Sequence, residues 1–196
     1  ANGLQALYSN TAGVNNTANG YQSLFSNTTG YRNTANGYRA LYSNTTGYYN
    51  TANGYESLYY NTTGVRNTAN GFRALYYNTT GGYNTANGIQ ALYSNTTGYY
   101  NIGIGYNADV SSGNLSNATA IGNGAIVTGS NKVRIGNSSV SVIEGQVAWT
   151  SVSDGRIKEN VQEAVPGLSF IAELRPVTYT LNTRKQDVLT MQAMPD

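Results

Sequence analysis

The first hundred residues of this chain repeat a nearly identical unit of 17 residues. Ala-Asn-Gly recurs once in every unit, beginning at Ala1, Ala18, Ala35, Ala52, Ala69 and Ala86. A leucine keeps the same register, at Leu7, Leu24, Leu41, Leu58, Leu75 and Leu92. An asparagine follows three positions later, at Asn10, Asn27, Asn44, Asn61, Asn78 and Asn95. The unit reads N-T-A-N-G-Y-(R/Q/E)-(A/S)-L-Y-(S/Y)-N-T-T-G-Y-x, and a fixed period of this kind indicates a repeat architecture in which each unit packs on its neighbours.

A period of 17 is too short for paired-helix repeats, which need more than about 30 residues, and each of the two glycines per unit would cost a helix about 1 kcal/mol. The sequence therefore predicts an all-β fold, a parallel β-solenoid with one 17-residue coil per repeat. Successive coils should stack at about 4.8 Å. We expect extended segments such as residues 38–42 (YRALY), which are rich in β-favouring aromatics. Asn-Thr-Thr-Gly and Asn-Thr-Ala-Asn-Gly should form the corners, because Asn and Gly tolerate positive φ.

Stacked coils place identical side chains above one another. The asparagine column is expected to form a ladder of amide hydrogen bonds, the tyrosine columns to stack their rings, and Leu41 and its equivalents to be buried. The tyrosines are too large and too numerous for the inside of a 17-residue coil, so many should lie on outer faces and pack between chains. A homotrimer of parallel coils is the simplest closed arrangement that buries such a lateral face.

Composition removes several classes of function. Asn, Thr, Gly and Tyr fill 63 of the first 100 positions, and these positions hold four Arg and one Glu, so no basic stripe exists for a nucleic-acid backbone. The chain has no Cys and no His, which excludes disulfides, imidazole bases and the usual zinc ligands. Asp109, near Asn107 and Asn114, is a poor calcium site with a single carboxylate, and we predict no metal and no cofactor. No apolar run approaches the roughly 20 residues of a membrane span.

Residues 101–137 begin in the 17-residue register but then shorten their coil. Ile121-Gly122-Asn123 and Ile135-Gly136-Asn137 are separated by 14 positions. Residues 118–137, ATAIGNGAIVTGSNKVRIGN, resemble the 14-residue repeat of trimeric autotransporter adhesin heads. That resemblance implies a parallel β-roll in a trimeric, extracellular, attachment-type structure. The N-T-A-x-G-x-x-A-L units of residues 1–100 are similar to arrays in phage tail fibres.

The acidic side chains are concentrated after the repeat array, since residues 101–196 hold eight of the nine. Residues 138–152 read as a tapering neck. The segment that follows resembles the opening S-D-x-R-x-K-x-N signature of the endosialidase-type intramolecular chaperone domain, through Ser153, Asp154, Arg156, Lys158 and Asn160. Residues 153–196 are thus expected to be the first part of that domain, a small α+β region, and the resemblance implies that it assists trimerisation of the fibre before it.

The same resemblance implies one self-cleavage. Many members of the chaperone family cut themselves just before the serine, which here is the Val152–Ser153 bond, with Lys158 as the base and Ser153 as its hydroxyl partner. A lysine deprotonates a hydroxyl only if burial or a neighbouring cation such as Arg156 lowers its pKa. The alternative stays open: Ser153 and Asp154 cap a turn, and Arg156 and Lys158 form exposed ion pairs.

The sequence therefore predicts a structural and attachment segment of an extracellular homotrimeric fibre, on a virion or a cell surface, closed by a chaperone domain. The alternative is a glycan-binding module that uses exposed tyrosine columns. An ice-binding solenoid is disfavoured because bulky Tyr and charged Arg interrupt the flat face that it would need. An enzyme acting on an external substrate is least favoured. Both ends are expected to be the limits of a segment of a longer polypeptide.

Overall fold

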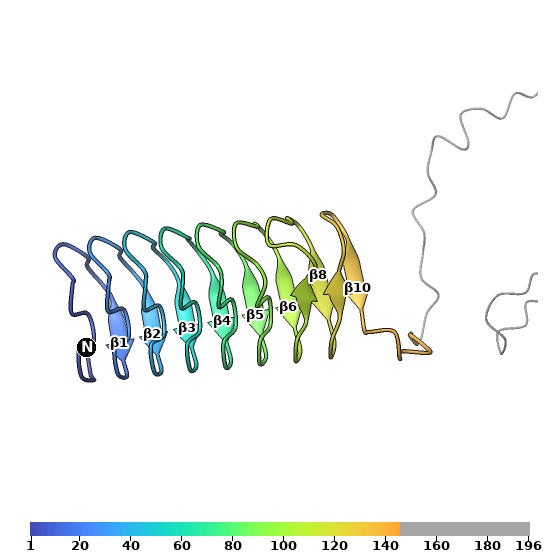
Figure 1. Ribbon diagram of the computed structural model, residues 1–196, viewed down its shortest axis with the longest axis horizontal. Coiled ribbons are helices and arrows are strands. Elements are labelled where there is room, and N and C mark those ends of the chain that lie inside the picture. Colours follow the sequence, from blue (N-terminus) through green and yellow to red (C-terminus); the bar gives the residue numbers. More distant parts are fainter. Residues whose placement is uncertain (146–196) are drawn as a thin grey trace, which may run out of the picture. The chain divides into compact units, whose positions relative to one another are not determined.

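A computed structural model describes residues 1–145, and residues Ala1–Ile143 form one compact unit. This unit is all-β, contains no helix within the described residues, and winds as a parallel β-solenoid (Figure 1). The predicted fold class is confirmed. The α+β region predicted for residues 153–196 lies outside the described residues.

Eight short strands, one per coil, form the main sheet, and two more form a second sheet. The main sheet contains β1 (Thr17–Asn19), β2 (Thr34–Asn36), β3 (Thr51–Asn53), β4 (Thr68–Asn70), β5 (Thr85–Asn87), β6 (Ile102–Ile104), β8 (Thr119–Ile121) and β10 (Val133–Ile135). The second sheet pairs β7 (Asp109–Val110) with β9 (Ile126–Val127). All pairs are parallel, and neighbouring strands of the main sheet are related by 17 residues up to Thr119 and by 14 between Thr119 and Val133.

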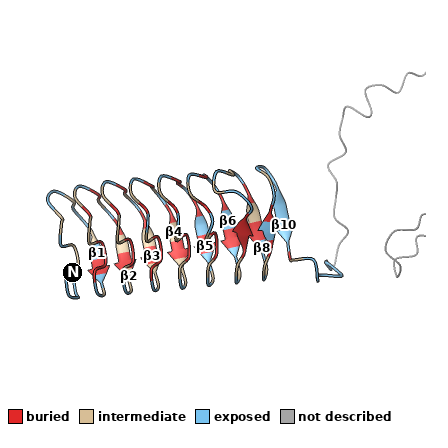
Figure 2. Ribbon diagram, viewed as in Figure 1, coloured by how far each residue is buried: buried red, intermediate tan, exposed pale blue. Residues whose placement is uncertain are grey.

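The core consists of two kinds of side chain. Strands alternate their side chains between two faces, so the alanine of each Thr-Ala-Asn strand points inward while Thr and Asn point outward. The alanines are accordingly fully buried, whereas Thr and Asn are only partly buried or exposed (Figure 2). The leucine column lies opposite, with Leu24, Leu41, Leu58, Leu75 and Leu92 at 0% exposure. A coil this narrow leaves room only for small and medium side chains, so the predicted leucine burial is confirmed and the tyrosines remain outside.

The prediction of a corner at Asn-Thr-Thr-Gly is confirmed, since the chain bends at Thr45 and Thr46, but the predicted strand and the predicted corner at Asn-Thr-Ala-Asn-Gly were wrong. Residues 34–36 form the strand, whereas residues 38–42 form a turn in which Arg39 and Leu41 have φ of 51° and 52°. Their backbone N–H groups are nevertheless paired with other coils: Arg39 donates to the carbonyl of Tyr21 at 2.9 Å, and Leu41 donates to that of Ser57 at 3.0 Å. Bonds between coils therefore override the β-propensity of the aromatic residues.

This turn becomes a strand only near the C-terminal end of the solenoid. Asp109 occupies the register position of Leu92 one coil later, but it lies in β7 and lacks the positive φ of the leucines. The buried apolar residue consequently moves one position along, to Val110 and then to Val127. A local change of φ is enough to change which side chain enters the core.

Two asparagine ladders run through the interior, and the predicted ladder is confirmed. In the first, the Asn61 amide donates to Asn44 Oδ1 at 2.8 Å and accepts from Asn78 at 2.8 Å. In the second, Asn67 donates to Asn50 Oδ1 at 3.2 Å and to the carbonyl of Gly81 at 2.8 Å. No buried side-chain nitrogen or oxygen within the described residues lacks a partner. Each interior amide is thus satisfied by neighbouring coils and by its own corner.

The glycine after each strand is required by close backbone approach. Gly37 has a φ of 137°, and a Cβ there would lie 2.5 Å from the carbonyl oxygen of Gly54 in the next coil. Any side chain would therefore separate the two coils as well as strain the backbone.

Replacing Asn61 by Ala is expected to destabilise the solenoid by about 1–3 kcal/mol, because Asn44 Oδ1 would be left buried without a donor. The control is Asn53→Ala, since Asn53 belongs to a third, outward-facing ladder with the same amide geometry, where water can replace the lost partner. Urea unfolding combined with amide hydrogen exchange measures both. Equal losses for the two variants would contradict the importance of burial.

Replacing Leu58 by Ile is expected to cost about 1–3 kcal/mol, because Leu58 is buried at a φ of 51° and a β-branched side chain disfavours this region. Leu58→Met is the matched control, since it keeps the volume without branching at Cβ and should cost less than about 1.5 kcal/mol. Urea unfolding compares the two, and an Ile variant as stable as the Met variant would show that the positive φ is not limiting.

Candidate functional site

The outer surface carries columns of stacked aromatic rings, as the repeat predicts. One column, here the Tyr38 column, contains Tyr21, Tyr38, Tyr55 and Phe72, with successive ring centroids 4.9 to 5.3 Å apart. Another, the Tyr42 column, contains Tyr8, Phe25, Tyr42, Tyr59, Tyr76 and Tyr93, spaced by 5.0 to 5.4 Å. Near-parallel planes at this spacing follow directly from the stacking of identical coils.

This stacking bears on the glycan-binding hypothesis. A sugar ring packs on the face of an aromatic ring, but both faces of an interior ring such as Tyr38 lie against neighbouring rings at 5.3 and 4.9 Å. What the columns offer to solvent along their length is ring edges and phenol hydroxyls. The geometry therefore gives no support to recognition of sugars by stacking.

Arginines join the two columns. The guanidinium carbon of Arg39 lies 5.2 Å from the ring centroid of Tyr38 and 5.5 Å from that of Tyr42. Arg73 lies 5.1 Å from both Phe72 and Tyr76. A cation within about 6 Å of an aromatic ring centroid is attracted by the ring quadrupole. Arg39 and Arg73 therefore both have partners within the chain.

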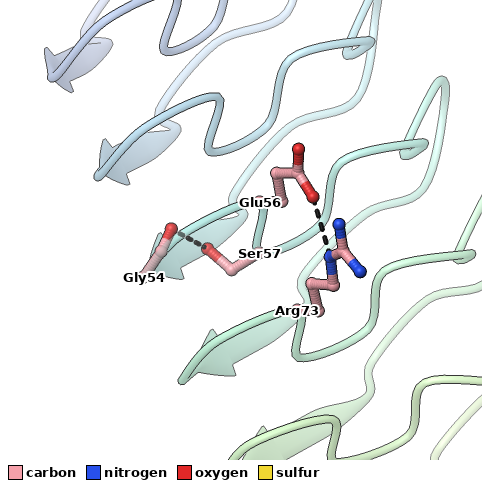
Figure 3. Close-up of polar contacts among 4 residues, drawn as sticks. All are labelled: Gly54, Glu56, Ser57 and Arg73. Carbon is pink, nitrogen blue, oxygen red and sulfur yellow. Dashed lines mark hydrogen bonds and ion pairs between the residues drawn. The ribbon is translucent and has the colours of Figure 1, made fainter.

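Arg39, Glu56 and Arg73 occupy the same position of three successive repeat units, and Glu56 is the single carboxylate of residues 1–100. Arg73 Nε donates to Glu56 Oε2 at 2.8 Å, and Glu56 is almost fully buried (Figure 3). Two repeat units earlier, Arg39 Nε donates to the neutral Gln22 Oε1 at 2.9 Å in the same arrangement. The hydrogen bond to Glu56 raises the pKa of Arg73. Glu56 is thus committed to a structural ion pair.

Arg73→Ala is expected to destabilise the solenoid by about 1–3 kcal/mol, because it leaves the Glu56 carboxylate buried without its cation. Arg39→Ala is the matched control: it loses equivalent ring contacts, but its partner Gln22 is neutral, so the loss should be smaller. Glu56→Gln should be tolerated for the same reason. Urea unfolding at neutral pH decides, and equal losses for the two arginine variants would contradict a special role for charge.

Another column, in which Arg and Tyr alternate from one coil to the next, contains Arg32, Tyr49, Arg66 and Tyr83. Arg66 Nη1 donates to the Tyr83 hydroxyl at 2.7 Å, its guanidinium carbon lies 5.6 Å from the Tyr49 ring, and Arg32 donates to the Tyr49 hydroxyl in the same way.

Tyrosines of the Tyr42 column are partly withdrawn from water, and this burial raises the pKa of Tyr76 to about 12. The phenol of Tyr76 is therefore neutral at physiological pH.

Asp109 is held by backbone groups. Its carboxylate accepts from Ser94 N–H at 3.1 Å and from Val110 N–H at 2.8 Å, and burial raises its pKa. Asn114, which the sequence places nearby, instead accepts a hydrogen bond from Ser112 Oγ. Across residues 1–145 no group of three or more carboxylates or other metal-binding side chains comes together. The described part of the chain also has no helix long and apolar enough to cross a membrane.

The outward face of the main sheet changes character along the solenoid. Over β1–β5 it presents Thr and Asn, and the Asn side chains bond to one another from coil to coil, as between Asn36 and Asn53 at 2.8 Å. Over β6, β8 and β10 the same register positions hold exposed apolar side chains: Ile102, Ile104, Ile121, Val133 and Ile135. Sequence reasoning missed this patch, although the replacement of Thr and Asn by Ile in the repeat register would have revealed it.

Ser153 and Lys158, the predicted self-cleavage pair, lie outside the described residues. Residues 153–191 match the family described as chaperone of endosialidase. Comparisons of the chain with curated proteins and with solved structures each gave no match. A parallel β-solenoid together with an endosialidase-chaperone segment fits a tail-fibre-like protein.

Proposed function

We propose that this chain is a structural segment of a tail-fibre-type homotrimer located outside the cell, on a virion or a cell surface, and that residues 153–196 promote its assembly. The observation that carries the proposal is the match of residues 153–191 to the endosialidase chaperone, in the same chain as a repetitive β-solenoid. A division into the array 1–100, the adhesin-like coils 101–137, the neck 138–152 and the chaperone segment is part of the proposal.

The surface of the solenoid supports lateral association. Many aromatic side chains remain partly in water, such as Tyr55 and Tyr60 at 42% and 41% exposure, and large apolar surfaces are removed from water when chains associate. Closed symmetry limits such association to a defined number of chains and prevents aggregation. Three parallel chains would bury one lateral face of each while leaving the ends of the coils free.

The assembly role is tested by the oligomeric state. The Ser153→Ala chain, which cannot cut itself, should have three times the mass of the 20.9 kDa protomer in light scattering, and deletion of everything after Trp149 should sharply reduce the yield of trimer. A stable folded monomer from the complete chain would overturn the trimer. A normal trimer yield from the deletion variant would overturn the assembly role alone.

We include in the proposal one self-cleavage at Val152–Ser153. Lys158, with its pKa lowered by Arg156, would take the proton of the Ser153 hydroxyl, and the oxygen would attack the Val152 carbonyl carbon. The protonated Lys158 would then give this proton to the Ser153 nitrogen as the C–N bond breaks. Water would then hydrolyse the resulting ester, leaving a carboxylate on Val152 and a free amine on Ser153. Each chain would react once, so the step is maturation and not turnover.

Intact-mass measurement tests the cleavage. The wild-type chain should separate into two fragments at Val152–Ser153, whereas Ser153→Ala should remain whole because it lacks the attacking hydroxyl. Lys158→Met, which keeps the side-chain length without the amine, should also remain whole. An uncut wild-type chain would remove the cleavage step and leave the assembly role standing.

A further inference from the structure

The apolar patch on the outward face of the main sheet consists of Ile102, Ile104, Ile121, Val133 and Ile135. These side chains are 36% to 69% exposed. They share one face because alternate residues of a strand point to the same side, and neighbouring strands are in register: Ile104 pairs with Ile121, which pairs with Ile135. Thr119 is the single polar residue among the six outward positions of the three strands.

We propose that this apolar patch is where parallel copies of the chain meet, and that the polar Thr/Asn face over β1–β5 is not. The inference rests on the proposed trimer, and it places the contact between chains on β6, β8 and β10 of the outward sheet face. Two parallel copies in register present identical rows at identical spacing, so each isoleucine row can pack against its equivalent. Contiguous exposed apolar surface of this kind is typical of an association site.

Polarity decides between a second copy and the chain's own C-terminal residues. The patch has no charged side chain at its outward positions, so its cover should be uncharged as well, and a copy of the same patch meets this requirement. Residues 146–196, by contrast, hold 11 of the 20 charged residues in little more than a quarter of the chain. Burying charges against isoleucine would cost free energy without compensation.

The upstream face has no comparable need for a partner. The Asn36 amide already donates to Asn53, which donates to Asn70 at 2.9 Å, and the exposed remainder of this face can be hydrated. Contact would therefore be made just before the segment that matches the endosialidase chaperone. Assembly promoted there would join the chains first at the coils nearest to it.

The first test replaces both Ile104 and Ile121 by Asn in the complete chain. Asn occupies the same register in β5, where Asn87 pairs with Ile104, so the variant fits the coil and should keep native amide-exchange protection. The fraction of trimer at fixed concentration should fall at least tenfold. Ile89→Asn is the matched control, because Ile89 is 49% exposed outside the patch, and its trimer should be unchanged.

The second test uses the absence of native cysteine. A thiol introduced by Ile121→Cys should react with a maleimide at least tenfold more slowly in the trimer than one introduced by Asn53→Cys on the upstream face. A trimer that persists in the double Asn variant would overturn this inference and leave the trimer itself standing. This outcome is expected if residues 146–196, and not a second copy, cover the patch. Equal labelling rates would also overturn it. A monomeric wild-type chain would instead overturn the proposed function.

Discussion

The structure depends on hydrogen bonds between identical buried asparagines of successive coils. An amide carries a donor and an acceptor, so Asn61 can donate to Asn44 and accept from Asn78 only if all three stand at the same position of consecutive coils. An insertion of one residue in one coil would place an amide against an apolar column and leave buried polar groups unpaired, at about 1–3 kcal/mol each. The ladders therefore fix the period at 17, and the leucine column and the aromatic stacks follow from it.

The change of period occurs where the ladders end. The position 17 residues after Asn95 is Ser112, so the first ladder cannot continue, and Asn101 of the second ladder donates to Asn95 Oδ1 at 2.9 Å. Asn101 also bonds Leu115 O, and Ala118 N–H donates to Asn101 Oδ1. Beyond this junction no repeated amide requires a spacing of 17: one further coil keeps it, from Ile102 to Thr119, and the coil after that is shortened to 14 residues, from Thr119 to Val133. The end of one interaction thus permits the change in coil size.

Repetition made most of this fold predictable, and local propensity misplaced its strands. Columns follow from the period alone, so the solenoid, the ladder through Asn61 and the burial of Leu41 could be inferred without coordinates. The strand could not, because YRALY at 38–42 has the stronger β-propensity, yet the positive φ of Arg39 and Leu41 is imposed by bonds to other coils. Likewise, a count of tyrosines predicts columns but does not say that the ring faces are covered by one another. The pair Ser153 and Lys158 came from family resemblance, and no local pattern could give its geometry.

The two parts of the outward sheet face place different demands on their surroundings. Over β1–β5 the asparagines bond to the next coil, as Asn53 does to Asn70, so this face is satisfied within one chain and in water. Over the last strands Ile104, Ile121 and Ile135 make no such bonds and remain in contact with solvent in a single chain. The outward sheet face therefore leaves apolar surface in water mainly at this end, while the ladders satisfy polar groups within each chain along the array. Adding coils of the Thr/Asn type therefore lengthens the solenoid without adding apolar surface to this sheet face, and the isoleucine strands precede in the sequence the residues that match the chaperone of endosialidase.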